Sequence, residues 1–153
     1  MTVNATIAEN RRARYDYFIE ETLEAGIVLT GTELKSLRHG QCSLNEAHAG
    51  PKFGEMFLMG AHIPEYAAAG KHLQHVPRAD RKLLLHKREK NKLLGAAARD
   101  GYTIVPIKMY FNARGRVKVL LGLAKGKKQH DKRESVKARD WNRQKAKVMN
   151  ARG

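Results

Sequence analysis

The sequence predicts a mainly β domain, interrupted by two helices and built as a small barrel or sandwich. Two observations indicate it: short runs in which apolar and polar residues alternate, and a β-hairpin near the end of these runs. The chain has 153 residues, 42% of them hydrophobic, which is enough for one core and too little for two. We divide it into a folded body, residues 1–124, and a basic tail, residues 125–153.

The hairpin spans residues 103–123. Its second strand places alternate apolar side chains on one face, which is typical of a half-buried strand: Val117, Val119, Leu121 and Leu123. Its first strand alternates in the same way: Thr103, Val105, Ile107, Met109 and Phe111. The connection Asn112–Gly115 is short and contains a glycine, so we expect the two strands to pair antiparallel.

Other short strands are expected at residues 15–21, 26–29, 55–59 and 61–63, separated by polar or glycine-bearing breaks. A first helix follows Thr30, which forms a capping box with Glu33, and it stops at Gly40. A second helix is predicted over about residues 82–99. Residues 64–80 contain prolines and a glycine with little hydrophobic period, and they predict a loop.

The net charge is +15, from 30 Lys and Arg against 15 Asp and Glu. Such a surface attracts polyanions, so nucleic acid is the expected class of partner. Over half of this charge lies in the tail, which has few large apolar residues to offset a backbone ordering cost of about 1–2 kcal/mol per residue. We therefore expect the tail to be disordered in the free protein and to become helical on a polyanionic partner.

The single cysteine, Cys42, excludes an internal disulfide and a zinc cage built from cysteines. A single unpaired cysteine is typical of a protein in a reducing compartment. The first ten residues are polar, and no stretch approaches the roughly 20 apolar residues that a membrane helix needs. We expect a soluble cytoplasmic protein that does not contact membranes.

The motifs that could carry chemistry are weak. Residues 122–128 differ from a phosphate-binding P-loop in glycine spacing and lack the hydroxyl residue after the lysine. His72 and His75 form a close pair in a loop without other ligands, which favours solvated side chains over a metal site. A hydrolytic pair of His130 with Lys127 or Lys128 would lie in the unfolded tail, where groups are not held in place. We expect no enzyme activity, no cofactor and no metal.

Two basic segments suit RNA. Residues 126–133 form a basic octet with one imidazole, His130, that could stack on a base. A charge run that only serves solubility is the alternative. Arg11 and Arg12 belong to a basic cluster before Tyr17, and a basic cluster beside an aromatic residue suits RNA, although Tyr17 could equally face the core.

Five ordered blocks of the chain resemble small protein B, the SsrA-binding protein family of bacteria. They are Asn10-Arg11-Arg12-Ala13, Glu24-Ala25-Gly26-Ile27, Gly31-Thr32-Glu33-Leu34-Lys35-Ser36-Leu37-Arg38, Arg81-Lys82-Leu83-Leu84-Leu85 and Gly126-Lys127-Lys128-Gln129-His130-Asp131-Lys132-Arg133. The resemblance spans about residues 8–150. It implies an oligonucleotide-binding-type antiparallel β-barrel with flanking helices and a C-terminal tail.

The resemblance also implies a function. The family binds the tRNA-like domain of transfer-messenger RNA (tmRNA) and brings it to stalled ribosomes for trans-translation, with elongation factor Tu involved indirectly through charged tmRNA. The tail would meet small-subunit rRNA near the decoding region and sense an empty mRNA channel. Two alternatives stand beside it: a generic basic RNA-binding or ribosome-assembly protein with an electrostatic tail, and an enzyme that acts on RNA.

Particular residues match the family's contacts. Those matching its RNA-contact patch are Asn10, Tyr17, Glu24 and Leu84, to which the basic cluster adds Arg11 and Arg12. Those matching its ribosome-engaging tail are Gly126, Lys127, Lys128, His130, Asp131, Lys132, Arg133, Trp141, Val148 and Met149. Many members carry Tyr at the position of His130 and Val at that of Leu34.

Three of the matched or neighbouring residues have open interpretations. Glu24 is acidic, so in an RNA interface it would accept hydrogen bonds from base amino groups or a 2′-hydroxyl. Glu33 could be no more than the capping partner of Thr30. Leu84 could be a core leucine of the second helix instead of a surface contact.

Overall fold

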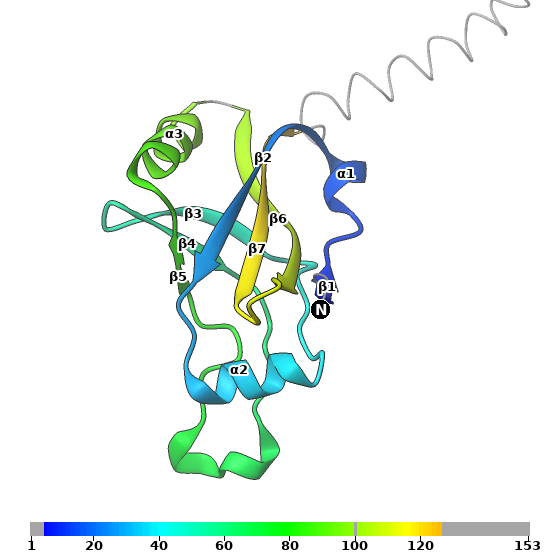
Figure 1. Ribbon diagram of the computed structural model, residues 1–153. Coiled ribbons are helices and arrows are strands. Elements are labelled where there is room, and N and C mark those ends of the chain that lie inside the picture. Colours follow the sequence, from blue (N-terminus) through cyan, green and yellow to red (C-terminus); the bar gives the residue numbers. More distant parts are fainter. Residues whose placement is uncertain (1–4, 100, 127–153) are drawn as a thin grey trace, which may run out of the picture.

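The computed structural model describes residues 5–99 and 101–126, which form an antiparallel β-barrel with helices around it (Figure 1). The strands are β1 (Ala5–Glu9), β2 (Tyr17–Ile27), β3 (His48–Lys52), β4 (Glu55–Met59), β5 (Arg81–Leu84), β6 (Tyr102–Phe111) and β7 (Val117–Gly126). The helices are α1 (Ala13–Asp16), α2 (Gly31–Arg38) and α3 (Lys87–Ala97). This confirms the expected mainly β fold of oligonucleotide-binding type. The tail residues 127–153 lie outside the described part of the chain.

The barrel closes because β6 and β7 also pair with each other. The strand order is β1-β6-β3-β4-β5-β2-β7, and β6 pairs with β7 as well, so six strands form a ring and β1 lies beside β6. All of these pairings are antiparallel. Closure of a sheet on itself satisfies the backbone groups that an open edge would expose.

The predicted hairpin is β6–β7, and its second strand behaves as expected. Val117, Val119, Leu121 and Leu123 all point into the barrel and are buried. The first strand departs from strict alternation because a bulge lies between Pro106 and Lys108. An extra residue in one strand turns the following side chains to the other face, so Ile104 and Met109 share the main core while Val105 lies outside the barrel wall.

The expected strands at residues 15–21 and 26–29 are parts of one strand, β2, because α1 occupies residues 13–16 and β7 pairs along nearly the whole of β2. Residues 61–63 are not a strand and contribute only one isolated bridge, between His62 and Ser43. The sequence did not indicate β1 or β3. In β3 the residues Gly50 and Pro51 disfavour a strand, and pairing with β4 imposes one.

The second helix was predicted too long. Residues 81–84 form strand β5, which pairs with β4 on one side and β2 on the other, and helix α3 begins only at Lys87. Burial follows a period of two, with Arg81 and Leu83 inside and Lys82 and Leu84 outside. Leucines and lysines also suit a helix, so long-range pairing decided the structure.

The first helix, α2, confirms the capping box. The Thr30 backbone N–H donates to Glu33 Oε1 at 2.8 Å, and the Glu33 N–H donates to Thr30 Oγ1 at 3.4 Å. Gly40 follows the helix with φ of +73°, a left-handed conformation that glycine adopts easily. The loop over residues 64–80 contains two short 3₁₀ turns, at Ala67–Ala69 and Lys71–Leu73.

The main core fills the barrel and extends beneath α2 and α3. Its largest fully buried side chains include Leu37, Leu44, Met56, Leu58, Ile63, Leu83, Leu93, Ile104, Met109 and Leu121. A second, smaller cluster of Ala13, Val105 and Ala124 lies between α1 and the outer face of β6 and β7. Within the residues that the structure describes, no helix is long and apolar enough to cross a membrane.

Candidate nucleic-acid interface

Glu24 and Leu84 come together on the outside of the barrel. Leu84 of β5 pairs in register with Gly26 of β2, and Gly26 lies two positions from Glu24 on the same face of the strand. A Cβ on Gly26 would come 3.3 Å from the Leu84 Cβ, so the glycine permits the close packing. Glu24 is exposed and Leu84 keeps 51% of its surface in solvent. Leu84 is therefore a surface residue on a strand, and the interpretation as a core leucine is wrong.

One side chain of the hairpin, Tyr110, contacts Glu24, and two lysines of the hairpin lie beside Tyr110. Lys118 of β7 lies in register between Gly26 on β2 and Tyr110 on β6. The Tyr110 hydroxyl donates a hydrogen bond to Glu24 Oε2. The Nζ of Lys108 lies 5.2 Å from the centre of the Tyr110 ring. Together with Lys82, which precedes Leu84 by two residues, these side chains form what we call the Glu24 patch: Glu24, Lys82, Leu84, Lys108, Tyr110 and Lys118.

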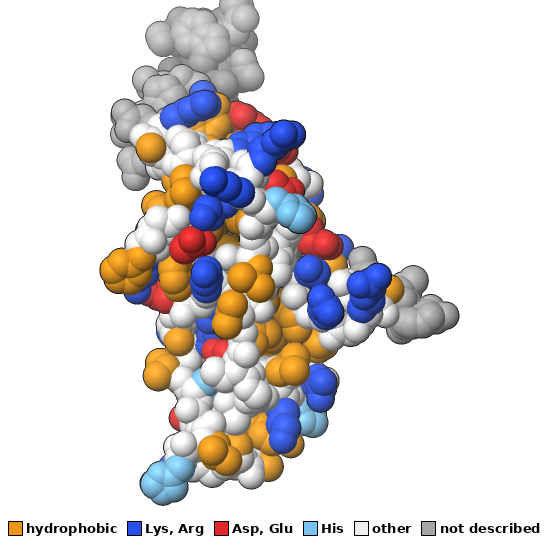
Figure 2. All heavy atoms as spheres, turned by 60° about the vertical axis from the view of Figure 1, so that its left-hand side comes forward, with side chains coloured by type: hydrophobic (Ala, Val, Ile, Leu, Met, Phe, Trp, Pro, Cys, Tyr) orange, Lys and Arg blue, Asp and Glu red, His pale blue; other side chains and the backbone are white. Residues whose placement is uncertain are grey.

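The Glu24 patch is cationic around a single carboxylate. Tyr110 is 4% exposed, and its pKa is raised above its usual value by burial and by the hydrogen bond to Glu24. The phenol therefore remains a donor at neutral pH and fixes the carboxylate in place. The lysines can bind phosphates, while the free lone pairs of Glu24 can accept from a base or a ribose hydroxyl. Figure 2 shows Lys and Arg side chains interspersed with hydrophobic side chains over the face that it draws.

Asn10, Arg12 and Tyr17 lie at the other end of β2. Tyr17 precedes Glu24 by seven positions, about 23 Å along a strand at roughly 3.3 Å per residue. Arg12 forms an ion pair with Asp16 at 3.5 Å and is largely exposed. Tyr17 is half-buried against the small cluster under α1. The structure thus brings Glu24 and Leu84 together and places the N-terminal residues in a second group.

Asn10 has an unsatisfied acceptor. It is 8% exposed, its backbone N–H donates to the Ile107 carbonyl at 2.8 Å, and its own carbonyl accepts from the Ala13 N–H at 3.1 Å. Its side-chain Oδ1 is buried and accepts no hydrogen bond from the described residues. Most buried polar atoms in proteins are satisfied, so this oxygen is an exception among the described residues. It lies beside a hollow between α1 and residues 45–48.

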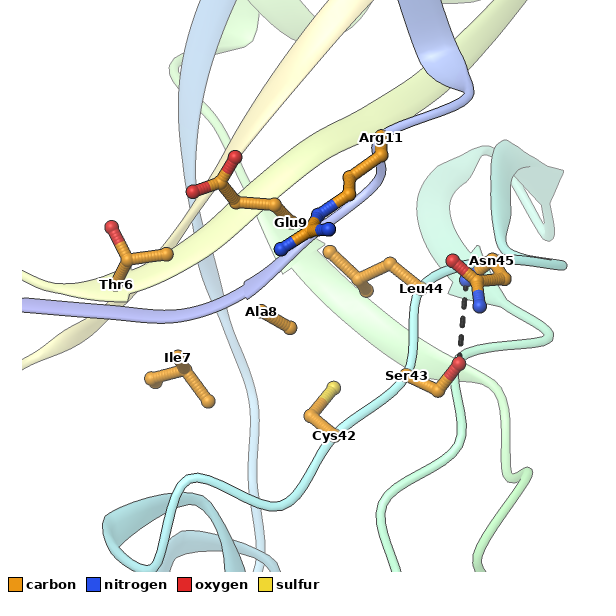
Figure 3. Close-up of a pocket in the computed structure, with 9 residues that line it drawn as sticks. All are labelled: Thr6, Ile7, Ala8, Glu9, Arg11, Cys42, Ser43, Leu44 and Asn45. Carbon is orange, nitrogen blue, oxygen red and sulfur yellow. Dashed lines mark hydrogen bonds between the residues drawn. The ribbon is translucent and has the colours of Figure 1, made fainter.

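Arg11 points elsewhere, over a hollow of about 600 Å³ between β1 and residues 42–45 (Figure 3). Glu9 and Cys42 also line this hollow, which shares no lining residue with the Glu24 patch. Burial raises the pKa of the Cys42 thiol to about 11, and the charge of Arg81 lowers it by a smaller amount. The thiol is therefore protonated at neutral pH and is a poor nucleophile.

Glu33 and His75 have structural roles, whereas His72 is exposed as expected. Glu33 is buried, and besides capping α2 it forms an ion pair with Arg81. His75 is buried and hydrogen-bonds Thr32 Oγ1 and the Ile63 carbonyl, each at 2.8 Å, so the expectation that it is solvated was wrong. In residues 5–99 and 101–126, no group of three or more His, Cys, Asp or Glu side chains is placed to hold a metal ion.

Sequence reasoning missed Lys108, Tyr110 and Lys118. The hairpin itself contained part of the signal, because Lys118 lies between the inward-facing Val117 and Val119. Its position beside Tyr110 and Gly26 depends on pairing registers across two bulges, at Ile19/Glu21 and Pro106/Lys108. Of the predicted tail residues, Gly126 ends β7, and its N–H donates to the Gly101 carbonyl at 3.0 Å. The others, from Lys127 to Met149, lie outside the described residues.

A closed antiparallel barrel with a cationic outer face defines a protein of the nucleic-acid-binding β-barrel class. The model of the SmpB protein family matches residues 7–151, and by this match the chain belongs to the SmpB family. It is 58% identical to the SsrA-binding protein of Rhodopseudomonas palustris (strain BisB18), over 96% of this chain and 93% of that one. It is 55% identical to the SsrA-binding protein of Rhodospirillum rubrum, over 96% and 92% of the two chains.

A solved structure agrees with the family. It is described as "tmRNA-SmpB: a journey to the center of the bacterial ribosome", and its chain is 51% identical to this one with a TM-score of 0.67. The match covers 84% of this chain and 92% of that chain. The family expected from the five sequence blocks is therefore confirmed, and it is a family of RNA-binding proteins.

Proposed function

We propose that this protein binds the tRNA-like domain of tmRNA and delivers it to stalled ribosomes for trans-translation, acting in the cytoplasm as a binding protein and not as an enzyme. The observation that carries the proposal is the Glu24 patch in a chain of this family: an oriented carboxylate and an exposed leucine, surrounded by lysines. Elongation factor Tu would take part indirectly, through charged tmRNA.

The residues of the Glu24 patch make different kinds of contact with the RNA. Lys82, Lys108 and Lys118 bind phosphates, which supplies affinity without sequence preference. Glu24 accepts hydrogen bonds from base amino groups or 2′-hydroxyls, and Leu84 packs against a sugar or base face. Asn10, Arg12 and Tyr17, which line one hollow at the start of β2, contact a second part of the folded RNA about 23 Å from Glu24 along the strand. Arg11, which lies over the neighbouring hollow, binds a phosphate there.

The tail is proposed to bind the ribosome. Lys125 and Gly126 belong to β7, so the predicted tail boundary at residue 125 is two residues too early. Residues 127–153, with 10 basic and 3 acidic side chains and therefore +7 net charge, enter the vacant mRNA channel of the small subunit and become helical as rRNA phosphates neutralise them. A message that occupies the channel excludes them. Gly126 ends β7 and is the point where the tail leaves the barrel. The residues proposed to enter the channel are Lys127, Lys128, His130, Asp131, Lys132, Arg133, Trp141, Val148 and Met149.

Equilibrium binding of the isolated tRNA-like domain tests the body. Glu24→Ala is the sharpest variant, because removal of a negative charge strengthens generic attraction to a polyanion but weakens binding if the carboxylate accepts hydrogen bonds. We expect weaker binding from Glu24→Ala and Leu84→Ala. Lys118→Ala is expected to lower the salt dependence by about 0.7–0.9 in log–log slope. Lys71→Ala, an exposed lysine in the loop over residues 64–80, is the control.

Two outcomes separate the alternatives. If Glu24→Ala strengthens binding and Lys71→Ala weakens it as much as Lys118→Ala does, the protein is a generic basic RNA binder. Trp141→Ala preserves charge, so an electrostatic tether would not respond to it. We expect it to leave binding of the tRNA-like domain unchanged and to reduce rescue of stalled ribosomes, and unchanged rescue would contradict the proposed role of the tail.

A further inference from the structure

The turn between β3 and β4 holds an aromatic residue in a strained conformation. Lys52 pairs with Glu55, so Phe53 and Gly54 form a two-residue hairpin loop. Both have positive φ, +53° and +76°, as a type I′ turn requires. Such turns favour Asn-Gly, because Asn tolerates this conformation and a bulky side chain does not. Phe53 is the one non-glycine residue with positive φ in the described part of the chain.

The Phe53 ring is mostly exposed, so its packing within the protein does little to offset the backbone strain. It is 89% exposed, and the hairpin projects from the barrel below α3 (Figure 1). An exposed aromatic ring kept at the cost of backbone strain is the kind of outlier that points to a binding role.

The surroundings of the ring are cationic and contain a second ring. Lys52 Nζ lies 5.8 Å from the ring centres of both Phe53 and Phe57, and it also pairs with Asp80 at 2.6 Å. Phe57 is half-buried and lies in register with Lys82 of β5. The nearby carboxylate of Glu55 is paired with Lys90 at 3.1 Å. Lys82, Lys87 and Arg88 are exposed, so the local charge favours an anionic partner.

This surface continues the Glu24 patch. Lys82 lies beside Phe57 on β4 and two residues from Leu84 on the same outer face of β5. A ligand that covers Leu84 can therefore extend over Lys82 toward the hairpin. Rings flanked by cations are the usual platform for unpaired bases, because the ring stacks on the base and the cations bind the adjoining phosphates.

We propose that the β3–β4 turn is a second RNA-binding element, in which the Phe53 ring stacks on an unpaired base and Lys82 binds a neighbouring phosphate. The inference rests on the proposed function, since it extends the same RNA interface. The base belongs to either the tRNA-like domain or the ribosome, which offer the same chemistry.

The test uses full-length variants, binding to the isolated tRNA-like domain and, separately, to ribosomes. Phe53→Ala is expected to weaken binding to one of the two by about 5-fold to 100-fold, the usual effect of losing one base stack. Phe53→Trp keeps a ring and should remain within about two-fold of wild type. Leu73→Ala, another exposed apolar residue at 71% exposure, is the control and should change neither.

Phe53→Asn separates binding from folding. It creates the favoured Asn-Gly turn, so the melting temperature should rise by about 2–8 °C while RNA binding falls as in Phe53→Ala. A residue kept for folding would show the opposite stability change. A lower melting temperature in this variant would show that Phe53 is structural and would overturn the inference.

The remaining outcomes are distinct. Weaker binding to the tRNA-like domain assigns the base to tmRNA, and weaker binding to ribosomes alone assigns it to rRNA. If wild type binds and Phe53→Ala binds both probes equally well, the inference is wrong and the proposed function stands. If wild type binds neither probe, the proposed function is wrong and the inference fails with it.

Discussion

Glu33→Gln is expected to destabilise the fold strongly while leaving the RNA interface intact. Glu33 and Arg81 form an ion pair with side chains only 4% and 2% exposed. Arg81 also donates to four backbone carbonyls, of Ala61, Ala79, Val76 and Pro77, at 3.0–3.2 Å. It therefore ties α2 to the segment that leads into β5. Removal of one partner leaves a buried charge uncompensated, which costs about 3–5 kcal/mol.

A double-mutant cycle measures the interaction energy between Glu33 and Arg81. Small domains have a total free energy of unfolding of about 5–15 kcal/mol. Glu33→Gln and Arg81→Met should each lower it by a large fraction, measured by urea unfolding followed by circular dichroism. The double variant removes both charges and should cost about 2–3 kcal/mol less than the sum of the single variants. The four carbonyls still lose their donor, so it remains less stable than wild type.

Two results would refute this reasoning. Additivity of the single variants within about 0.5 kcal/mol would show that the two charges do not stabilise each other. Loss of RNA binding by folded Glu33→Gln at low temperature, with an unchanged unfolding curve, would assign Glu33 to the interface instead of the fold.

Three further predictions follow from local geometry. Gly60→Ala should lower the melting temperature more than Gly70→Ala, because both have φ near +80° but only at Gly60 would a Cβ meet a backbone oxygen, that of Glu46 at 2.6 Å; equal losses would contradict this. Wild-type stability should fall as pH rises above about 10, since the raised pKa of Tyr110 means that the folded state holds its proton longer than the unfolded state. Tyr110→Phe should reduce this fall in melting temperature, and identical pH slopes would count against it. Because the pKa of Cys42 is about 11 against an ordinary 9.0, iodoacetamide should alkylate the folded protein at pH 8 about 10-fold more slowly than a free cysteine, since the smaller thiolate fraction is partly offset by the greater nucleophilicity of that thiolate; alkylation as fast as that of a free cysteine would show that the pKa is not raised.

Features that depend on neighbouring residues could be predicted from the sequence. The capping box of Thr30 and Glu33 and the β6–β7 hairpin have all of their determinants within a few residues. Strand β5 could not be recognised, because residues 81–84 are extended only through pairing with β4 and β2. His75 was misjudged for the same reason, since its partners Thr32 and Ile63 lie 43 and 12 residues away.

Only part of the candidate site could be predicted from the sequence. Glu24 and Leu84 came from a family resemblance, which named the residues without placing them in the fold. The structure adds that Tyr110 donates a hydrogen bond to the carboxylate and that Lys118 pairs in register with Tyr110. Neither could be placed from spacing alone, since each bulge shifts the pairing by one residue and reverses which side chains face outward.

The most direct test of the proposed function is to sequence the RNA that co-purifies with the tagged full-length protein from cells, beside the Glu24→Ala and Leu84→Ala variants. We predict strong enrichment of one abundant RNA with a tRNA-like end, and loss of that enrichment in both variants. Recovery of cellular RNAs in proportion to their abundance, unchanged by either substitution, would contradict the assignment.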